Sequence, residues 1–213
     1  MLRYKRNQVE EAIAAALDRR NADVASELRI RIKRLLETDR ALGREPRAFY
    51  AFYTSEAPGR GLEVWFSDYE AFALLIGLLL MQHRWPQGTA VRLMREARPT
   101  LEPEHARILA QDRDELFDPA QIEAHAAPGM IAVATTRPVF LAVVTAGRSE
   151  AAKAEGALHV VRVCRSEADL MRFMRQQAPP GMSTTAIEVA SLAHRLADRL
   201  ARTEPKRRGR SGR

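Results

Sequence analysis

The chain has 213 residues, and its 34 lysines and arginines against 27 acids give a formal net charge of +7 at pH 7. This length allows one large domain or two small ones, and the 46% of hydrophobic residues is ordinary for a globular protein with a core. The single cysteine, Cys164, excludes an internal disulfide, and the longest apolar run, Ala71 to Met81, is too short to cross a membrane.

Five of the seven net positive charges lie in the last nine residues, which contain no acid. Without that segment the other 204 residues carry a net charge of only +2. Arginine outnumbers lysine 30 to 4, which is typical of a GC-rich bacterial genome. The basic N-terminus lacks the apolar stretch of a signal peptide. The single cysteine leads us to expect a bacterial protein of the cytoplasm.

The first part of the chain is predicted to be helical. Apolar residues recur with three- and four-residue spacing over residues 7–42, as in an amphipathic helix. Asn21 is placed to cap a second helix and divide this region into a hairpin, which Gly43 and Pro46 end. Residues 48–66 hold many aromatics around a turn-forming segment, so we expect a β-hairpin, or a pair of short strands, that fills a core.

A capped, strongly apolar helix follows. Ser67 and Glu70 have the spacing of a capping box, and the helix is expected over residues 68–83, buried on nearly every side. A second helix is predicted over residues 87–98, and Pro99 is expected to end it. A third helix then begins at Thr100 and continues through Leu109.

The remainder of the chain alternates between strands and helices. Ser166 is expected to cap a helix that reaches about residue 177, and Ser183, Thr184 or Thr185 to cap the last helix. Cys164 closes an apolar strand and is interpreted as a buried, inert thiol. The other elements predicted here are a short helix from Asp118 to His125 and strands over residues 130–133, 139–145 and 158–164.

Together these elements predict an α+β, mostly helical fold. A helical N-terminal lobe over residues 1–117 carries the β-hairpin at 48–66, and a small α+β lobe covers residues 118–204. Residues 205–213 are expected to form a disordered basic tail. A single mixed domain is the alternative, because no long linker separates the lobes.

Two helices and the tail carry cations suited to a polyanion. Arg92, Arg95 and Arg98 recur every third residue, so they are expected on one side of a short helix after a tight turn, as in a helix-turn-helix reader. Arg29 and Lys33 lie one turn apart in a locally basic helix. The tail adds salt-sensitive attraction to phosphates through Lys206, Arg207, Arg208 and Arg210.

Competing interpretations exist for each cationic group. The helical arginines and lysines could be solvated faces paired with neighbouring acids. The tail could serve only to keep the protein in solution, or it could bind an acidic protein partner. Residues 48–150 hold nine cations and thirteen acids, which argues against close docking of this region on DNA.

One stretch resembles a known family. It comprises Val64-Trp65-Phe66-Ser67-Asp68-Tyr69-Glu70, the apolar helix that follows, Trp85-Pro86 and Val91-Arg92-Leu93-Met94. Over about residues 64–98 this is similar to the helical part of MerR-type transcriptional regulators, which implies a related helical packing. In that family the DNA-reading helices precede this segment, whereas here Phe49 to Phe66 occupy their place. No site residue is therefore carried over from the family.

No catalytic or metal-binding motif appears in the sequence. No two of the five histidines have the i, i+4 spacing of a helical zinc site, and neither a phosphate loop nor a nucleophile elbow is present. The sequence does not exclude an enzyme, because active sites assemble from residues that are distant in sequence. No motif favours an enzyme, however, and no cofactor or metal is expected. The sequence thus favours a DNA-binding regulator that does not enter membranes. The alternative is a non-enzymatic protein-interaction module, with a protein partner or a homodimer.

Overall fold

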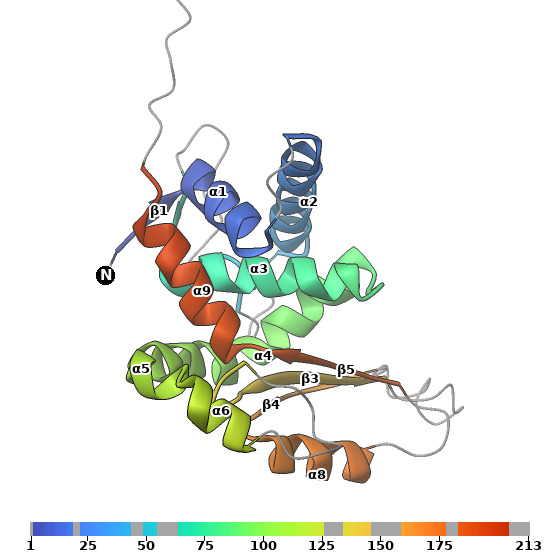
Figure 1. Ribbon diagram of the computed structural model, residues 1–213. Coiled ribbons are helices and arrows are strands. Elements are labelled where there is room, and N and C mark those ends of the chain that lie inside the picture. Colours follow the sequence, from blue (N-terminus) through green and yellow to red (C-terminus); the bar gives the residue numbers. More distant parts are fainter. Residues whose placement is uncertain are drawn as a thin grey trace, which may run out of the picture. The chain divides into compact units, whose positions relative to one another are not determined.

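The computed structural model describes residues 2–18, 22–43, 49–54, 64–125, 134–145, 159–177 and 183–204. The fold is α+β and mostly helical, as the sequence predicted. The chain divides into two compact units (Figure 1). Unit 1 comprises Met1–Arg95 and Arg195–Arg213, and unit 2 comprises Glu96–His194.

This division differs from the expected lobes of residues 1–117 and 118–204. The end of the C-terminal helix belongs to unit 1, because Gln8 Nε2 donates to the Thr203 carbonyl at 2.9 Å and Arg195 pairs with Asp18. Such contacts join residues almost 200 positions apart, and no local pattern reveals them. The predicted disordered tail, residues 205–213, lies outside the described residues.

Unit 1 begins with the predicted pair of helices, α1 (Arg6–Ala16) and α2 (Ala22–Ala41). Their apolar stripes are buried, with Ile13 on α1 and Leu35 on α2 fully inaccessible to solvent. Gly43 follows α2 with a φ of 63°, in the left-handed region that glycine occupies without strain. It therefore ends the helix as predicted, whereas the expected cap at Asn21 lies outside the described residues.

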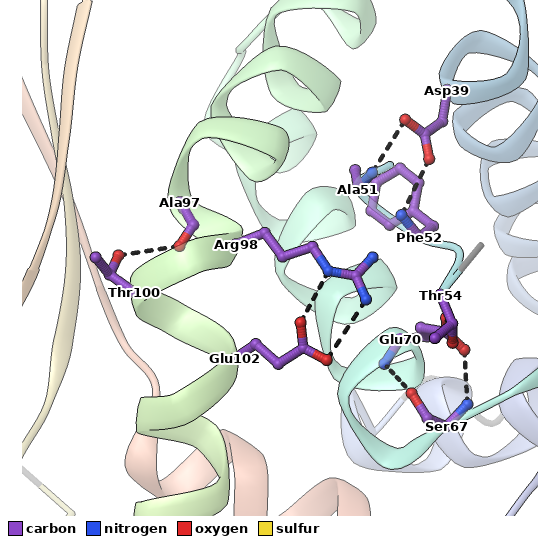
Figure 2. Close-up of polar contacts among 10 residues, drawn as sticks. All are labelled: Asp39, Ala51, Phe52, Thr54, Ser67, Glu70, Ala97, Arg98, Thr100 and Glu102. Carbon is purple, nitrogen blue, oxygen red and sulfur yellow. Dashed lines mark hydrogen bonds and ion pairs between the residues drawn. The ribbon is translucent and has the colours of Figure 1, made fainter. Parts of the chain in front are cut away.

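The predicted apolar helix is α3 (Asp68–Gln82), and its capping box is confirmed. The Glu70 N–H donates to Ser67 Oγ at 3.2 Å, and the Ser67 N–H donates to the Glu70 carboxylate at 2.8 Å (Figure 2). Nearly every side chain of α3 is buried. Gly77 permits this close packing, since a Cβ there would lie 3.2 Å from the Phe52 ring and 3.4 Å from Leu35.

The β-hairpin predicted at 48–66 is wrong for its first half, because the described residues 49–54 form no strand. The N–H groups of Ala51 and Phe52 donate to a side chain, the Asp39 carboxylate, instead of a neighbouring strand. The second half, β2 (Trp65–Phe66), pairs in antiparallel fashion with β1 (Tyr4–Lys5). The expectation that aromatic residues of this segment fill a core is confirmed for Phe52 and Phe66, which are fully buried.

Helix α4 (Gln87–Leu109) continues through the predicted stop at Pro99. Proline inside a helix removes one hydrogen bond and costs about 3 kcal/mol. Contacts on both sides of Pro99 offset this cost, since Ala97 and Leu101 are buried and the Thr100 hydroxyl donates to the Ala97 carbonyl at 3.0 Å (Figure 2). Tertiary packing therefore overrides the local signal.

Unit 2 contains a three-stranded antiparallel sheet in the order β4-β3-β5 (Figure 1). Strand β3 (Phe140–Thr145) is central, and β4 (His159–Cys164) and β5 (Ser183–Glu188) flank it. Helix α8 (Glu167–Gln177) connects β4 to β5 and covers one face, where Phe140, Cys164 and Phe173 share a core. This is a split βαβ arrangement.

The remaining elements of unit 2 match the sequence in part. Short helices α5 (Arg113–Leu116) and α6 (Pro119–His125) precede the sheet, and α6 was predicted. Ser166 caps α8 as expected, because its Oγ accepts from the Asp169 N–H at 3.1 Å. The strand predicted over residues 130–133 lies outside the described residues.

The prediction that Ser183, Thr184 or Thr185 caps the last helix is wrong. These residues form β5, where Thr185 lies opposite Val143 of the central strand. The helix α9 (Ala190–Ala201) begins later, and the Glu188 carboxylate caps it by accepting from the N–H groups of Ala190 and Ser191 at 2.8 and 3.0 Å. Threonine is favoured both at helix N-caps and in strands, so the residue types alone do not distinguish the two structures. Only the pairing with β3 shows that this segment is a strand.

Candidate nucleic-acid interface

The three arginines predicted to form a DNA-facing side of α4 have different environments. Arg92 is exposed, whereas Arg95 and Arg98 are 9% and 4% exposed. Each step of three residues turns about 60° around a helix, so the three positions sweep about 120°. Part of that sweep lies against the protein interior, and the predicted common arginine face is therefore wrong.

Arg95 is tied into unit 1 by several contacts. Its Nε donates to Asp39 Oδ1 at 2.7 Å, and its Nη1 donates to the Gly43 carbonyl at 2.8 Å. The guanidinium also lies over the Tyr50 ring, 5.3 Å from its centroid. Through these contacts Arg95 stabilises the fold of unit 1 and does not face DNA.

Asp39 needs this cation because its side chain has no exposure to solvent. Besides Arg95, it accepts the N–H groups of Ala51 and Phe52 at 3.1 and 3.0 Å (Figure 2). A buried carboxylate with a salt bridge and two backbone hydrogen bonds is fully satisfied. It fixes the segment 49–54 against the end of α2.

Arg98 forms an ion pair with an acid of its own helix, α4. Its Nε donates to Glu102 Oε2 at 2.9 Å, one turn further along the helix (Figure 2). Its side chain is 5% exposed, while that of Glu102 is 39% exposed. The guanidinium therefore does not face the solvent that a DNA duplex would occupy.

The two predicted cations of α2 are exposed. Arg29 and Lys33 have side-chain exposures of 64% and 61%. Each lies near an acid, since Arg29 Nε is 3.7 Å from Glu10 and Lys33 Nζ is 3.7 Å from Glu37. The Lys33–Glu37 pair is exposed on both sides and contributes little to stability, so Lys33 can exchange Glu37 for a phosphate. The guanidinium of Arg29 is exposed although Glu10 is not, so it too can reach a phosphate.

Arg6 of α1 joins this group, and the sequence prediction missed it. Its Nε donates to Glu10 at 2.7 Å, and Glu10 also approaches Arg29. Glu10 is 14% exposed, against 40% for Arg6, so the carboxylate lies beneath the guanidinium groups. We call Arg6, Arg29 and Lys33 the basic flank of unit 1. The i, i+4 spacing of Arg6 and Glu10 is visible in the sequence, but their proximity to Arg29 is not.

Arg92 does not belong to the basic flank. Helix α4 contacts α2 through Gln87, whose side-chain amide donates to the Arg34 carbonyl at 3.2 Å and to Thr38. Arg29, by contrast, lies where α2 meets α1, because Arg6 Nη2 approaches the Arg29 carbonyl at 3.5 Å. Arg6 therefore lies beside Arg29, and Lys33 is one turn further along α2, whereas no hydrogen bond or ion pair in the described part of the chain joins Arg92 to them. The tail residues Lys206, Arg207, Arg208 and Arg210 lie outside the described residues.

The division into units separates the charges. Unit 1 holds 24 of the 34 cations and 14 of the 27 acids, a formal charge of +10, whereas unit 2 holds 10 cations and 13 acids, a formal charge of −3. The acids that argued against DNA docking of residues 48–150 thus belong mostly to the other unit. The basic flank lies in the strongly cationic part of the chain.

Three titratable groups of unit 2, His105, His194 and Cys164, are buried. Burial, and then the neighbouring His194, lower the pKa of His105 to about 4, and His194 bonds to the Ile108 carbonyl at 3.1 Å. Burial raises the pKa of Cys164 to about 11, in agreement with the predicted inert thiol. Among the residues in the ranges given above, no group of three or more His, Cys, Asp and Glu could hold a metal ion.

No family model matches the chain, and no curated protein matches it. The similarity of residues 64–98 to MerR-type regulators stays a prediction from sequence. None of the helices in the described part of the chain combines the length and the apolar character needed to cross a bilayer.

Proposed function

We propose that this is a bacterial nucleic-acid-associated protein of the cytoplasm, a DNA-binding regulator that contacts phosphates through unit 1. The contacts are assigned to Arg6, Arg29 and Lys33 of the basic flank, to Arg92, and to the cations of the tail. The observation that supports this most is the separation of charge, +10 in unit 1 against −3 in unit 2. Arg95 and Arg98 are not part of the proposal, because both are internal.

The physical basis is electrostatic attraction without base readout. Each phosphate neutralised by an arginine or lysine releases counterions, and binding weakens steeply as salt rises. Exposed guanidinium groups above a covered carboxylate present their charge outward, as Arg6 and Arg29 do above Glu10. Arg95 and Arg98 are buried, so they do not add contacts of α4 to DNA. Phosphate contacts by the exposed cations are therefore the proposed main source of affinity.

Fluorescence anisotropy with a labelled DNA duplex tests the proposal. The double variant Arg29→Gln/Lys33→Gln should lower the slope of log affinity against log salt by about 2, close to 0.9 for each phosphate that is no longer neutralised. The matched control Arg172→Gln/Arg175→Gln removes two exposed arginines of unit 2 and should leave the slope unchanged. No binding of the full chain at about 50 mM salt would contradict the proposal.

A second candidate is a non-enzymatic protein-interaction module. It is supported by the internal positions of Arg95 and Arg98 and by large apolar side chains exposed on unit 1, namely Leu2, Phe49 and Trp65 at 69, 55 and 41%. Purification of a stoichiometric protein partner, with an ultraviolet spectrum free of nucleic acid, would favour this candidate. Light scattering on the isolated protein separates a homodimer from a complex with another chain.

A further inference from the structure

A pair of arginines in unit 2 shares one carboxylate. Glu104 of α4 has a side-chain exposure of only 1%. Its Oε2 accepts from Arg165 Nε at 3.0 Å, and its Oε1 accepts from Arg107 Nε at 3.0 Å and from Arg107 Nη2. Arg165 directly follows β4, 61 positions along the chain, so two separate elements meet on this carboxylate.

The shared carboxylate carries a negative charge. Burial alone would raise the pKa of Glu104, but the hydrogen bonds and charges of Arg107 and Arg165 hold it below its ordinary value. Two guanidinium groups and one carboxylate leave a local charge of +1. The hydrogen bonds also fix both guanidinium groups in one orientation, so less conformational entropy remains to be lost when an anion binds.

Both guanidinium groups keep donors that face solvent. The side chain of Arg165 is 71% exposed and that of Arg107 is 45% exposed, above a carboxylate that is almost fully covered. Arg165 uses only its Nε on Glu104, and Arg107 uses its Nε and Nη2, so Nη groups of both remain available within the described part of the chain. Planar guanidinium donors match the spacing of phosphate oxygens.

Arg162 of β4 also pairs with an acid that is less exposed than itself. Its Nη2 donates to Asp169 at 3.1 Å, and Asp169 also accepts from the Arg165 N–H at 3.2 Å. The side chain of Arg162 is 44% exposed and that of Asp169 is 20% exposed, so the cation again lies outermost. The Arg162 guanidinium lies over the Phe173 ring, 5.6 Å from its centroid, which limits its movement.

We propose that Arg107 and Arg165, held by Glu104, form a phosphate-binding clamp on unit 2. The clamp gives a cationic surface to a unit whose formal charge is −3. Its ligand is the phosphate group itself, carried by a nucleic-acid backbone or by a small phosphorylated anion. The clamp therefore does not depend on DNA binding by unit 1.

Nuclear magnetic resonance of the full-length protein tests the clamp. The Nε–Hε signals of Arg107 and Arg165 are followed during titration with pyrophosphate and, separately, with a short DNA duplex, against chloride at equal ionic strength. Pyrophosphate should shift both signals to saturation, and Arg165→Gln should weaken its binding at least about tenfold, since the variant cannot form the charged hydrogen bond. The control Arg175→Gln removes an exposed arginine of α8 and should change the affinity less than about twofold.

The two sources of phosphate are distinguished by the two titrations. A response to the duplex supports a nucleic-acid ligand, and a response to pyrophosphate alone supports a small anion. Shifts no larger than those caused by chloride, or equal pyrophosphate affinity of Arg165→Gln and the unchanged protein, would overturn the clamp. If Arg165→Gln does not fold, Arg165→Lys keeps a charge near Glu104 without the planar fork and should bind several-fold more weakly. Loss of DNA binding through unit 1 leaves the pyrophosphate result unaffected, so the two proposals fail separately.

Discussion

Removal of the buried charge at Asp39 should strongly destabilise unit 1. Asp39 has no exposure to solvent and satisfies Arg95 together with the N–H groups of Ala51 and Phe52. Loss of one partner of a buried ion pair costs about 3–5 kcal/mol, and each abandoned backbone donor adds about 1–3 kcal/mol. Asp39→Ala should therefore lower the free energy of unfolding by at least about 5 kcal/mol, the lower end of the total stability of about 5–15 kcal/mol that is typical of a domain.

Two milder variants allow the coupling between Asp39 and Arg95 to be measured. Asp39→Asn keeps an oxygen acceptor, and Arg95→Met keeps bulk, so each should cost about 3 kcal/mol in urea unfolding followed by circular dichroism. The double variant should cost less than the sum of the singles by about 2 kcal/mol, because each single leaves one buried group without its partner. Costs that add to within about 0.5 kcal/mol would refute the pairing. Folded Arg95→Met should bind DNA as the unchanged protein does.

Three further predictions concern local features. Ser67→Ala should lower the free energy of unfolding by about 1 kcal/mol, measured by urea unfolding, since it removes the cap that Glu70 completes. The unfolded chain takes up a proton at His105 near pH 6.5, but the folded chain does so only near pH 4, so stability should be constant above pH 6.5 and fall by up to about 3 kcal/mol towards pH 4. Urea titrations at several pH values check this, and His105→Gln should flatten the profile. Cys164 should react with a thiol reagent at pH 8 far more slowly in the folded protein than in urea, and equal rates would contradict its burial.

Features set by neighbours in sequence were predictable. The capping box of Ser67 and Glu70, the cap at Ser166 and the helix end at Gly43 each depend on a few adjacent residues, and the structure confirms all three. Hydrophobic spacing likewise located α3 and the central strand β3. Such signals are local, so a single sequence contains them.

Features that depend on distant contacts were not predictable. The pairing of Arg95 with Asp39, 56 positions apart, turned an expected surface cation into a buried one. The antiparallel partner of β2 is at the N-terminus of the chain, which no hairpin pattern suggests. Pro99 stayed within α4 because its flanking side chains pack inward. In each case tertiary contacts outweighed the local preference.

The candidate interface was predicted in its components but not in its arrangement. Arg29, Lys33 and Arg92 were identified from sequence and are exposed. Arg6 was missed, because only the packing of α1 on α2 brings Arg6 and its helical partner Glu10 close to Arg29. The separation of charge between the units was also hidden, since only the fold brings Arg195 and Thr203 to the N-terminal part of the chain.

DNA binding by a full-length variant with an uncharged tail tests the central claim most directly. Replacement of Lys206, Arg207, Arg208, Arg210 and Arg213 by glutamine leaves the described part of unit 1 unchanged. Anisotropy titrations with duplex DNA from about 50 to 200 mM salt should still show binding, with the salt slope lower by up to about 4.5, close to 0.9 for each of five charges. Complete loss of binding at about 50 mM salt would show that the compact part of unit 1 offers no surface to a polyanion, and would contradict the proposed function.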